Sequence, residues 1–423
     1  MAEQHGKALV PQIRFAGFTD PWEQRKLGEL YKEVSEKNDL TYGRDRIISV
    51  AHMYFNPVVY VTEDDYLKTY NVMRLGDIAF EGNRSKNFAH GRLVENTIGD
   101  GIVSHVFKVF RPIRPFDLMY WKYSINNEKA MKDVLTRSTK ASTMMHELVA
   151  KDFLNEEIAV PSLEEQRQIG AFFDRLDSLI TLHQRKYDKL CVLKKSMLDR
   201  MFPKGGSLYP EIRFAGFTDP WEQRKLGEEL GFLRNNTLSR AELSDSEGTV
   251  FDIHYGDVLI KYGSVLDAEK ADVPRIANDA VANRQTCDCL QDGDVIIADT
   301  AEDSAVGKCT ELCNSAGKKV FSGLHTMPLR PMRKYASGYL GHYLNSPAFH
   351  DQLLPLMQGI KVISVSRSAI EDMTMSVPSV AEQASIGAFF DRLASLITLH
   401  QRKYCGVVSW MLGVALVRLS SEK

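Results

Sequence analysis

The chain has 423 residues, of which 44% are hydrophobic and 26% are charged, and its formal net charge at pH 7 is −2. This length exceeds what one hydrophobic core supports, and the composition is that of a folded protein, so two or three domains are expected. The first ten residues lack a signal-peptide pattern, no uncharged apolar stretch is long enough to span a membrane, and six cysteines are too few for a secreted disulfide framework. We therefore expect a cytoplasmic protein.

Two segments of the chain occur twice. Residues 13–29, IRFAGFTDPWEQRKLGE, return unchanged at 212–228, and residues 169–187 return at 386–404 with a single change. A solenoid repeats every 20–50 residues or so, about one supersecondary unit at a time. Here the period is about 200 residues, so each copy is a domain with its connector. The segments between the repeats differ, which indicates two different surfaces on one framework.

The repeats divide the chain into six predicted regions. In chain order these are an N-terminal framework segment at 1–29, a first module at 30–160, a central helix at 161–203, a linker with the repeated framework segment at 204–229, a second module at 230–377 and a C-terminal helix at 378–423. Both modules mix short strand-like runs with helical stretches, so we expect an α+β fold with an internal pseudo-twofold repeat.

In the first module, residues 74–80 are predicted to form a turn leading into a strand, residues 103–110 a further strand, and residues 120–135 a helical stretch. The stretch 84–114 holds six Lys and Arg residues but only two carboxylates. This local charge matters because the low net charge of the whole chain argues against a general binder of phosphate backbones.

The central helix is predicted to run from about residue 164 to 201. Ser162 is expected to cap it, Glu165 to complete a capping box, and Pro203 to end it. Such a helix would be a rod of about 55 Å. Apolar residues recur along it at alternating steps of three and four and form a heptad seam, which begins at Ile169, Phe172, Leu176 and Leu179.

The second module contains the similar runs 256–260 and 293–297, which are both predicted to be turns leading into strands, and a helical stretch at 339–357. In each module a histidine, His105 or His325, precedes a strand-like run that ends in Arg-Pro. The two modules therefore look like two copies of one α+β fold whose surfaces have diverged.

The second module also carries two close cysteine pairs, Cys287 with Cys289 and Cys309 with Cys313. Structural zinc sites usually separate paired ligands by about two to four residues. The second pair fits that spacing and the first is tight, so reduced thiols are the favoured interpretation, zinc is the alternative, and no metal ligands are assigned.

The C-terminal helix repeats the seam of the central helix at Ile386, Phe389, Leu393 and Leu396. Two matched heptad helices in one chain most simply pair with each other, and we expect an antiparallel pair. The polar seam residues His183 and His400 are interpreted as setting the register, with a metal or catalytic role as the alternative. From Cys405 to Val417 the helix is apolar on all sides, which indicates either a surface that a partner covers or an altered ending.

No catalytic residues are predicted. The sequence lacks the glycine-rich P-loop pattern, and the run from Asn56 to Tyr60 lacks the second proline of the amino-methyltransferase motif. A nuclease or methyltransferase acting alone would need a catalytic constellation, which we do not find. A purely structural coiled-coil scaffold would not need two large divergent modules.

Taken together, these features resemble the specificity subunits of type I restriction–modification systems, and the resemblance covers the whole chain. Its carriers are the segment WEQRKLGE at 22–29 and 221–228, and the dipeptide Glu-Gln at 165–166 and 382–383, which IGAFFDRL follows each time. The family implies that each module is a target-recognition domain for one half of a bipartite DNA sequence, with the paired helices setting the gap between the halves.

The same resemblance implies that this subunit performs no catalysis and holds no cofactor. Modification subunits would bring S-adenosylmethionine, and restriction subunits would bring ATP-driven translocation and cleavage, with Mg on those partners. The alternative is a stand-alone DNA-binding or scaffold protein without methyltransferase partners.

Basic residues in loop-rich stretches are the candidates for DNA contact. They are Arg84, Lys86, Arg92, His105 and Lys140 in the first module, and Arg284, Lys308, Lys361 and Arg367 in the second. Side chains that reach base edges would read sequence, whereas those on phosphates would position the protein. Ordinary solvated surface charge is the alternative for each of them.

Overall fold

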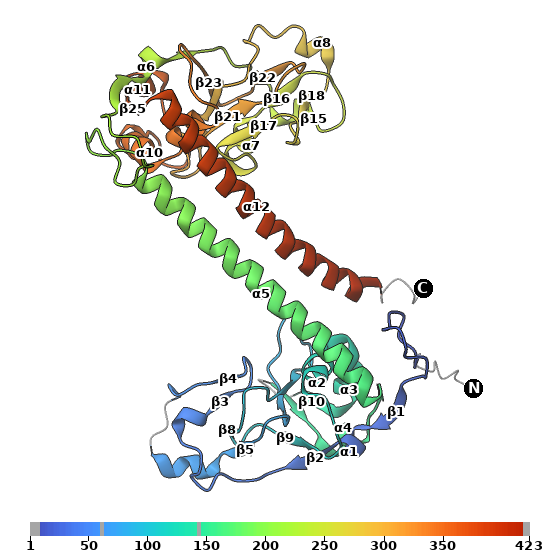
Figure 1. Cartoon of the computed structure of the whole chain (residues 1–423). Coiled ribbons are helices and arrows are strands. Elements are labelled where there is room, and N and C mark those ends of the chain that lie inside the picture. Colours follow the sequence, from blue (N-terminus) through green and yellow to red (C-terminus); the bar gives the residue numbers. More distant parts are fainter. Residues whose placement is uncertain (1–8, 60–62, 142–144, 418–423) are drawn as a thin grey trace. The chain divides into compact units, whose positions relative to one another are not determined.

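A computed structural model describes residues 9–59, 63–141 and 145–417, with side chains as far as Gly406 (Figure 1). The chain divides into two compact units, one with residues up to Leu182 and the stretch from Val407, the other with His183–Gly406. Helix α5, Leu163–Arg200, begins in the first unit and ends in the second, which confirms the predicted central helix. Helix α12, Val380–Val417, begins in the second unit. The predicted α+β class is also confirmed.

The first module is built on a four-stranded antiparallel sheet. Its strand order is β2 (Tyr31–Val34), β9 (Val109–Pro112), β6 (Ile78–Glu81), β7 (Arg92–Glu95). Since successive residues of a strand point to opposite faces, β6 serves two cores. Ile78 and Phe80 pack with the helical residue Trp121, while Ala79 packs with Met73 on the other face. Both faces of this sheet are therefore covered.

Among the described residues, four two-stranded pairs, four α-helices and the 3-10 helices Arg44–Arg46 and Asp64–Thr69 complete the first module and its framework segment. The pairs are β1 (Glu23–Lys26) with β12 (Glu157–Val160), β3 (Ile48–Ser49) with β4 (Tyr54–Phe55), β5 (Asn71–Met73) with β8 (Gly101–Val103), and β10 (Thr139–Ala141) with β11 (His146–Leu148). The helices are α1 (Leu27–Leu30), α2 (Leu118–Ile125), α3 (Glu128–Ser138) and α4 (Ala150–Asn155). The stretch 103–110, predicted as one strand, instead holds the end of β8, a turn and the start of β9.

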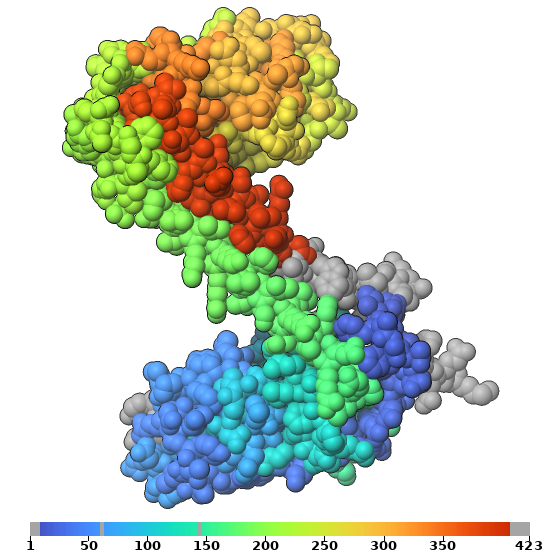
Figure 2. Space-filling view, viewed as in Figure 1, coloured from blue at the N-terminus to red at the C-terminus, as the bar shows by residue number. Residues whose placement is uncertain are grey.

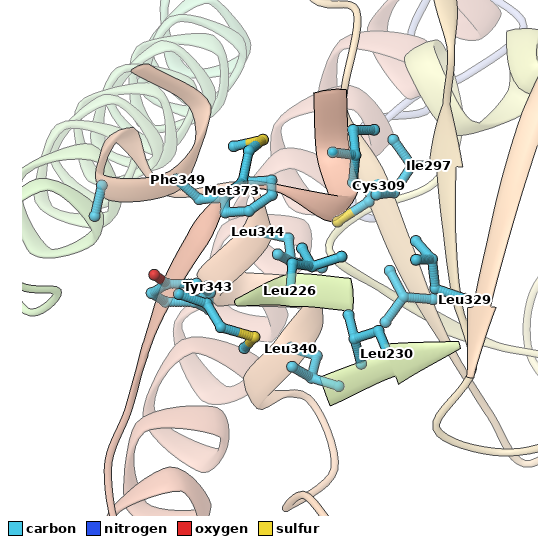
Figure 3. Close-up of a cluster of buried hydrophobic side chains, with 14 of the residues drawn as sticks. Leu226, Leu230, Ile297, Cys309, Leu329, Leu340, Tyr343, Leu344, Phe349 and Met373 are labelled. Carbon is cyan, nitrogen blue, oxygen red and sulfur yellow. The ribbon is translucent and has the colours of Figure 1, made fainter. Parts of the chain in front are cut away.

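The second module repeats the strand order of the first and adds one strand. Its main sheet is β14 (Leu230–Phe232), β23 (Thr326–Pro331), β19 (Val295–Ala298), β21 (Cys309–Cys313), β17 (Val265–Asp267). Strand residues Leu230, Ile297 and Leu329 pack against Leu340 and Leu344 of helix α9 in one core (Figure 3). The predicted likeness of the two modules therefore extends to their central strands.

The remaining elements of the second module form a second sheet, two strand pairs and six helices. The second sheet is β15 (Leu243–Ser244), β18 (Arg275–Ile276), β16 (Phe251–Ile253), β22 (Val320–Ser322). The pairs are β13 (Glu222–Lys225) with β25 (Thr374–Val377) and β20 (Thr300–Ala301) with β24 (Ile363–Ser364). The helices are α6 (Leu226–Glu229), α7 (Tyr255–Ile260), α8 (Asp279–Ala282), α9 (Tyr339–Leu344), α10 (Pro347–Leu353) and α11 (Arg367–Glu371).

One predicted strand of the second module is wrong. The run 256–260 is part of helix α7 and not a strand like 293–297. The His254 side chain accepts a hydrogen bond from the backbone N–H of Gly256 and so caps the helix. A capped turn competes with an extended strand over so short an apolar run, and periodicity alone does not separate the two.

The repeated framework segments close each module onto the start of its own long helix. Strand β1 pairs with β12 and strand β13 pairs with β25, so each framework segment runs beside the strand that enters α5 or α12. In the second unit, Figure 2 shows the yellow-green framework segment against the beginning of the red helix α12. The identical framework sequences therefore form the same strand pairing in both repeats.

The predicted capping box at Ser162 forms only in part. The Ser162 hydroxyl accepts a hydrogen bond from the Glu165 backbone N–H, 3.3 Å away. The Glu165 carboxylate does not return to the helix start, because Arg14 holds it through two hydrogen bonds of 2.7 and 2.8 Å. Arg213 holds Glu382 in the same way in the second repeat. A buried carboxylate needs such a partner, so this contact fixes the helix to the framework.

The long helices run antiparallel within the second unit. His183 Nδ1 lies 3.1 Å from His400 Nδ1, and the ring of Phe202, two residues after the end of α5, stacks on Phe390, which lies earlier in α12. His183 and His400 are equivalent positions of the two repeats, so antiparallel pairing brings like residues face to face.

The observed packing differs from the predicted seam at several positions. Ile169 packs on the core of the first module and Phe172 on Phe15, while Ile386 packs on the core of the second module and Phe389 on Phe214. Leu179 and Leu396 are exposed to 47% and 39%. The start of each helix therefore docks on its own module and framework. Leu176 is half-buried and Leu393 is buried.

Among the described residues, none of the helices combines the length and the apolar character that a bilayer span requires. The predicted apolar stretch from Cys405 to Val417 lies on α12, and the side chains of Val407–Val417 are outside those described.

Candidate nucleic-acid interface

A buried aspartate–arginine pair fixes the central strand of each module. Asp77, just before β6, binds Arg111 of β9, with Nη2 to Oδ2 at 2.9 Å. Asp294, just before β19, binds Arg330 of β23, with Nη2 to Oδ2 at 2.7 Å. The Asp77 carboxylate raises the pKa of Arg111. These are the Gly-Asp turns and Arg-Pro endings that look alike in sequence, and the pairing explains their recurrence.

A loop follows each of these two strands, β6 and β19. In each module this loop lies against the segment that precedes the long helix. In the first module the His146 backbone N–H donates to the Gly82 carbonyl at 2.8 Å, so the loop at 82–91 meets the hairpin β10–β11. In the second module the loop at 299–308 contains β20, which pairs with β24. Each module thus joins two distant segments into one surface, which we call the loop–hairpin surface.

Three of the predicted DNA-binding residues of the first module lie on its loop–hairpin surface. Arg84 and Lys86 are exposed on the loop, and Lys140 is exposed on β10. Burial lowers the pKa of His146, and the charges of His90 and Arg84 add to this effect. The ring centroids of His90 and His146 are 5.1 Å apart, so the loop contacts the hairpin.

The other two predicted residues of the first module have different surroundings. Arg92 is half-buried and donates to Glu81 at 2.7 Å and to the Ala51 carbonyl at 2.6 Å, so its guanidinium holds the base of the loop together. His105 is exposed in the turn between β8 and β9, outside the loop–hairpin surface.

In the second module, Lys361 and Arg367 lie on or beside the hairpin of the loop–hairpin surface, and both are exposed. The Arg367 guanidinium lies over the ring of Phe232, 4.7 Å from its centroid. Lys308 is half-buried and donates to the Leu259 carbonyl at 2.5 Å, and burial lowers its pKa. Arg284 is exposed next to the end of α8, outside the loop–hairpin surface.

The two loop–hairpin surfaces differ in charge. The loop at 82–91 carries Arg84 and Lys86 and no carboxylate, whereas the loop at 299–308 carries Asp299, Glu302 and Asp303. The equivalent loops of the two modules therefore differ in the sign of their charge. The two surfaces would select different partners or different features of one partner.

The cysteines do not form a cluster. Cys287 packs at the edge of one hydrophobic cluster of the second module, and Cys309 lies inside another. Within residues 9–59, 63–141 and 145–417, no group of three or more His, Cys, Asp and Glu side chains is placed to hold a metal ion.

The chain thus holds two copies of one framework, and each copy bears a different exposed loop–hairpin surface. Residues 19–191, which span the first module and most of α5, match the family described as the type I restriction modification DNA specificity domain. The framework segments that bound this domain return in the second repeat. Over these residues the chain matches the specificity domain of type I restriction–modification systems, which confirms the expected resemblance to specificity subunits.

Among curated proteins, the chain is similar to the type I restriction enzyme MjaVIII specificity subunit of Methanocaldococcus jannaschii. The two are 25% identical over 247 residues, which cover 54% of this chain and 53% of that protein. The chain thus spans about half the length of the curated relative that it matches.

Solved structures similar to the chain include the HsdS subunit from Thermoanaerobacter tengcongensis, at 17% identity and a TM-score of 0.47, over 95% of this chain and 97% of that one. The type I restriction–modification S subunit from M. genitalium is 13% identical with a TM-score of 0.48, over 97% of this chain and 98% of that one.

Proposed function

We propose that this chain is the DNA-reading subunit of a type I restriction–modification complex, and that each module reads one half of a bipartite target. The observation that carries the proposal is the duplicated frame with two unlike loop–hairpin surfaces. The ion pairs Arg14–Glu165 and Arg213–Glu382 hold both modules to their helices in the same way. A shared frame with different contact surfaces suits two different half-sites.

The long helices would set the gap between the half-sites. Helix α5 has 38 residues, which corresponds to a rod of about 57 Å. Half-sites one to one-and-a-half DNA turns apart are separated by about 34–51 Å. A continuous helix of this length is therefore long enough to fix such a spacing.

Catalysis would come from partner subunits. Modification subunits would carry S-adenosylmethionine and restriction subunits would carry ATP and Mg, while this chain supplies sequence recognition in the cytoplasm. Its weak net charge is compatible with partners that provide much of the phosphate contact.

A module exchange tests the proposal. Residues 30–160 would be replaced by the module of another family member, and the methylated sequence would be mapped in the reconstituted complex. One half-site should change and the other should stay. The intact chain with S-adenosylmethionine but without partners should leave DNA unmethylated. A change in both half-sites or in neither, or methyl transfer by the chain alone, would contradict the proposal.

A further inference from the structure

The hairpin of the second module projects an uncovered isoleucine. Gln358 and Ser364 close this hairpin through two backbone hydrogen bonds, of 3.0 and 2.8 Å. Gly359 has a φ of +113°, and a Cβ at this position would lie 1.9 Å from the Val362 carbonyl oxygen, so only glycine fits the turn. Ile360 at the tip is 98% exposed, and Val362 beside it is 57% exposed.

The base of the hairpin is held firmly. Ser364 and Ile363 pair with Thr300 and Ala301 in an antiparallel ladder, and the next residue, Val365, is buried in the core of the module. The Val365 backbone N–H also donates to the Asp299 carbonyl at 3.0 Å. The exposed tip is therefore carried on a fixed support, which is what a side chain needs if it is to press into a partner.

The cations of this surface lie on the hairpin and at the start of α11. From residue 352 to residue 370 the chain holds Lys361 and Arg367 and no carboxylate, whereas Asp299, Glu302 and Asp303 lie on the paired loop, so the phosphates would be bound from the hairpin side. Both cations are exposed, and Arg367 lies at the first position of α11, three residues after Ser364. An apolar tip flanked by cations is the pattern of proteins that insert a wedge between base pairs while they bind the adjacent phosphates.

We propose that Ile360 is a wedge that enters between two adjacent base pairs of bound duplex DNA and partly unstacks them, while Lys361 and Arg367 bind the flanking phosphates. This inference rests on the proposed function, because it names the DNA contact of the second module. The free energy of unstacking two adjacent base pairs depends on their sequence. Ile360 would therefore contribute to sequence specificity without a hydrogen bond to a base.

The test uses the full-length chain reconstituted with its modification subunits, and duplex DNA that this complex selects from a random pool. 2-Aminopurine, whose fluorescence rises when it is unstacked, would replace each adenine of the selected site in turn. Binding should raise the fluorescence several-fold at one step in the half-site of the second module. Ile360→Ser should remove this rise and weaken binding by about tenfold, comparable to one mismatched base pair. Ile360→Leu should retain both.

Ile260→Ser provides the matched control, because Ile260 is 87% exposed in the same unit but lies at the end of α7. It should change neither affinity nor fluorescence. The wedge is refuted if Ile360→Ser binds with wild-type affinity and fluorescence, or if it loses only the capture of modification subunits. Selection of no sequence by the wild-type chain in complex with its modification subunits would instead overturn the proposed function, and the wedge with it.

Discussion

At the scale of single residues, buried charges that look alike in sequence serve the same purpose in both modules. Asp294 is fully buried, and its carboxylate binds Arg330 and accepts a hydrogen bond from the Gln291 backbone N–H. Asp77 makes the equivalent contacts with Arg111 and the Arg74 backbone N–H. Each pair fixes the turn before β6 or β19, and the loop that follows this strand forms part of the loop–hairpin surface.

Removing one partner of this pair should destabilise the second unit strongly. Asp294→Ala should cost about 3–5 kcal/mol, because it leaves the Arg330 guanidinium without its carboxylate partner at a largely buried site. Urea unfolding followed by hydrogen exchange of the second unit measures the loss. The control is Lys270→Ala, which breaks the exposed ion pair with Asp267 and should cost less than about 1 kcal/mol. Equal costs for the two variants would contradict the assignment.

Glu95 should make the first unit less stable to unfolding as the pH rises. A carboxylate with a lowered pKa has the opposite effect. Burial, with a smaller contribution from Asp117, raises its pKa to about 9, and the backbone N–H of Lys122 only partly opposes this. The folded chain therefore binds a proton that the unfolded chain has lost between pH 4.5 and 9. This contribution to stability is complete below the unfolded pKa and is lost as the pH rises toward 9.

Glu95→Gln should remove this dependence, because the amide is neutral at every pH. The variant should match the wild type near pH 5 and exceed it at pH 8, by an amount on the order of a few kcal/mol. Urea unfolding at both pH values, read out on the first unit, measures the difference. Glu147→Gln, at an exposed site on β11, should show no such divergence. A Glu95→Gln variant that is less stable than the wild type at pH 8 would show that the ionised carboxylate is stabilising.

At the scale of elements, the long helices show what sequence can and cannot predict. Their extents follow from periodicity and end signals, and α5 ends within a residue of the prediction. The role of Glu165 could not be predicted, because its partner Arg14 lies 151 residues away. The docking of Ile169 and Ile386 on their modules could not be predicted, because a heptad pattern does not distinguish a helix–helix contact from docking on a module. The basic loop residues Arg84 and Lys86 were found from local charge, whereas the exposed tip at Ile360 carries no periodic signal.

The facing histidines should make the helix pair sensitive to acid. Desolvation lowers the pKa of His400, and the charges of His183, Lys186 and Lys403 lower it further. A group whose folded pKa is lowered contributes stability above its unfolded pKa of about 6.5 and loses it as the pH falls. The double variant His183→Asn with His400→Asn should therefore gain stability relative to the wild type at pH 5 but not at pH 8.

Thermal unfolding of the second unit at pH 5, 6 and 8 measures this gain as the difference between variant and wild type. Gln401→Asn is the control, since Gln401 is exposed on α12 and has no titratable side chain. The difference should be independent of pH for the control. A double variant whose difference is also independent of pH would show that the pair does not respond to acid.

At the scale of the whole molecule, the framework and the surfaces would divide the two tasks of the proposed bipartite reader between them. The framework positions each module on its helix through residues that are identical in both repeats, while the loop–hairpin surfaces carry the differences. Recognition can then change in one module without altering the support of the other. The gap between half-sites would depend only on the helices.

Lengthening the helices should therefore change the gap and leave the half-sites as they are. Seven residues would be inserted into α5 between Leu182 and His183, with seven more in α12 between Gly406 and Val407, where the two compact units divide. Seven residues preserve the heptad phase and add about 10 Å, or about three base pairs. Sites selected from random DNA should show the original half-sites with a gap about three base pairs longer.

Affinity should also fall in this variant, because three base pairs rotate one half-site by about a third of a turn relative to the other. An insertion in α5 alone serves as the control, since it shifts one helix against the other and should weaken selection of any defined gap. Altered half-sites with an unchanged gap would show that the helices do not set the spacing. Altered half-sites with a longer gap would show instead that each module depends on the helix beyond the contacts of Glu165 and Glu382 with their arginines.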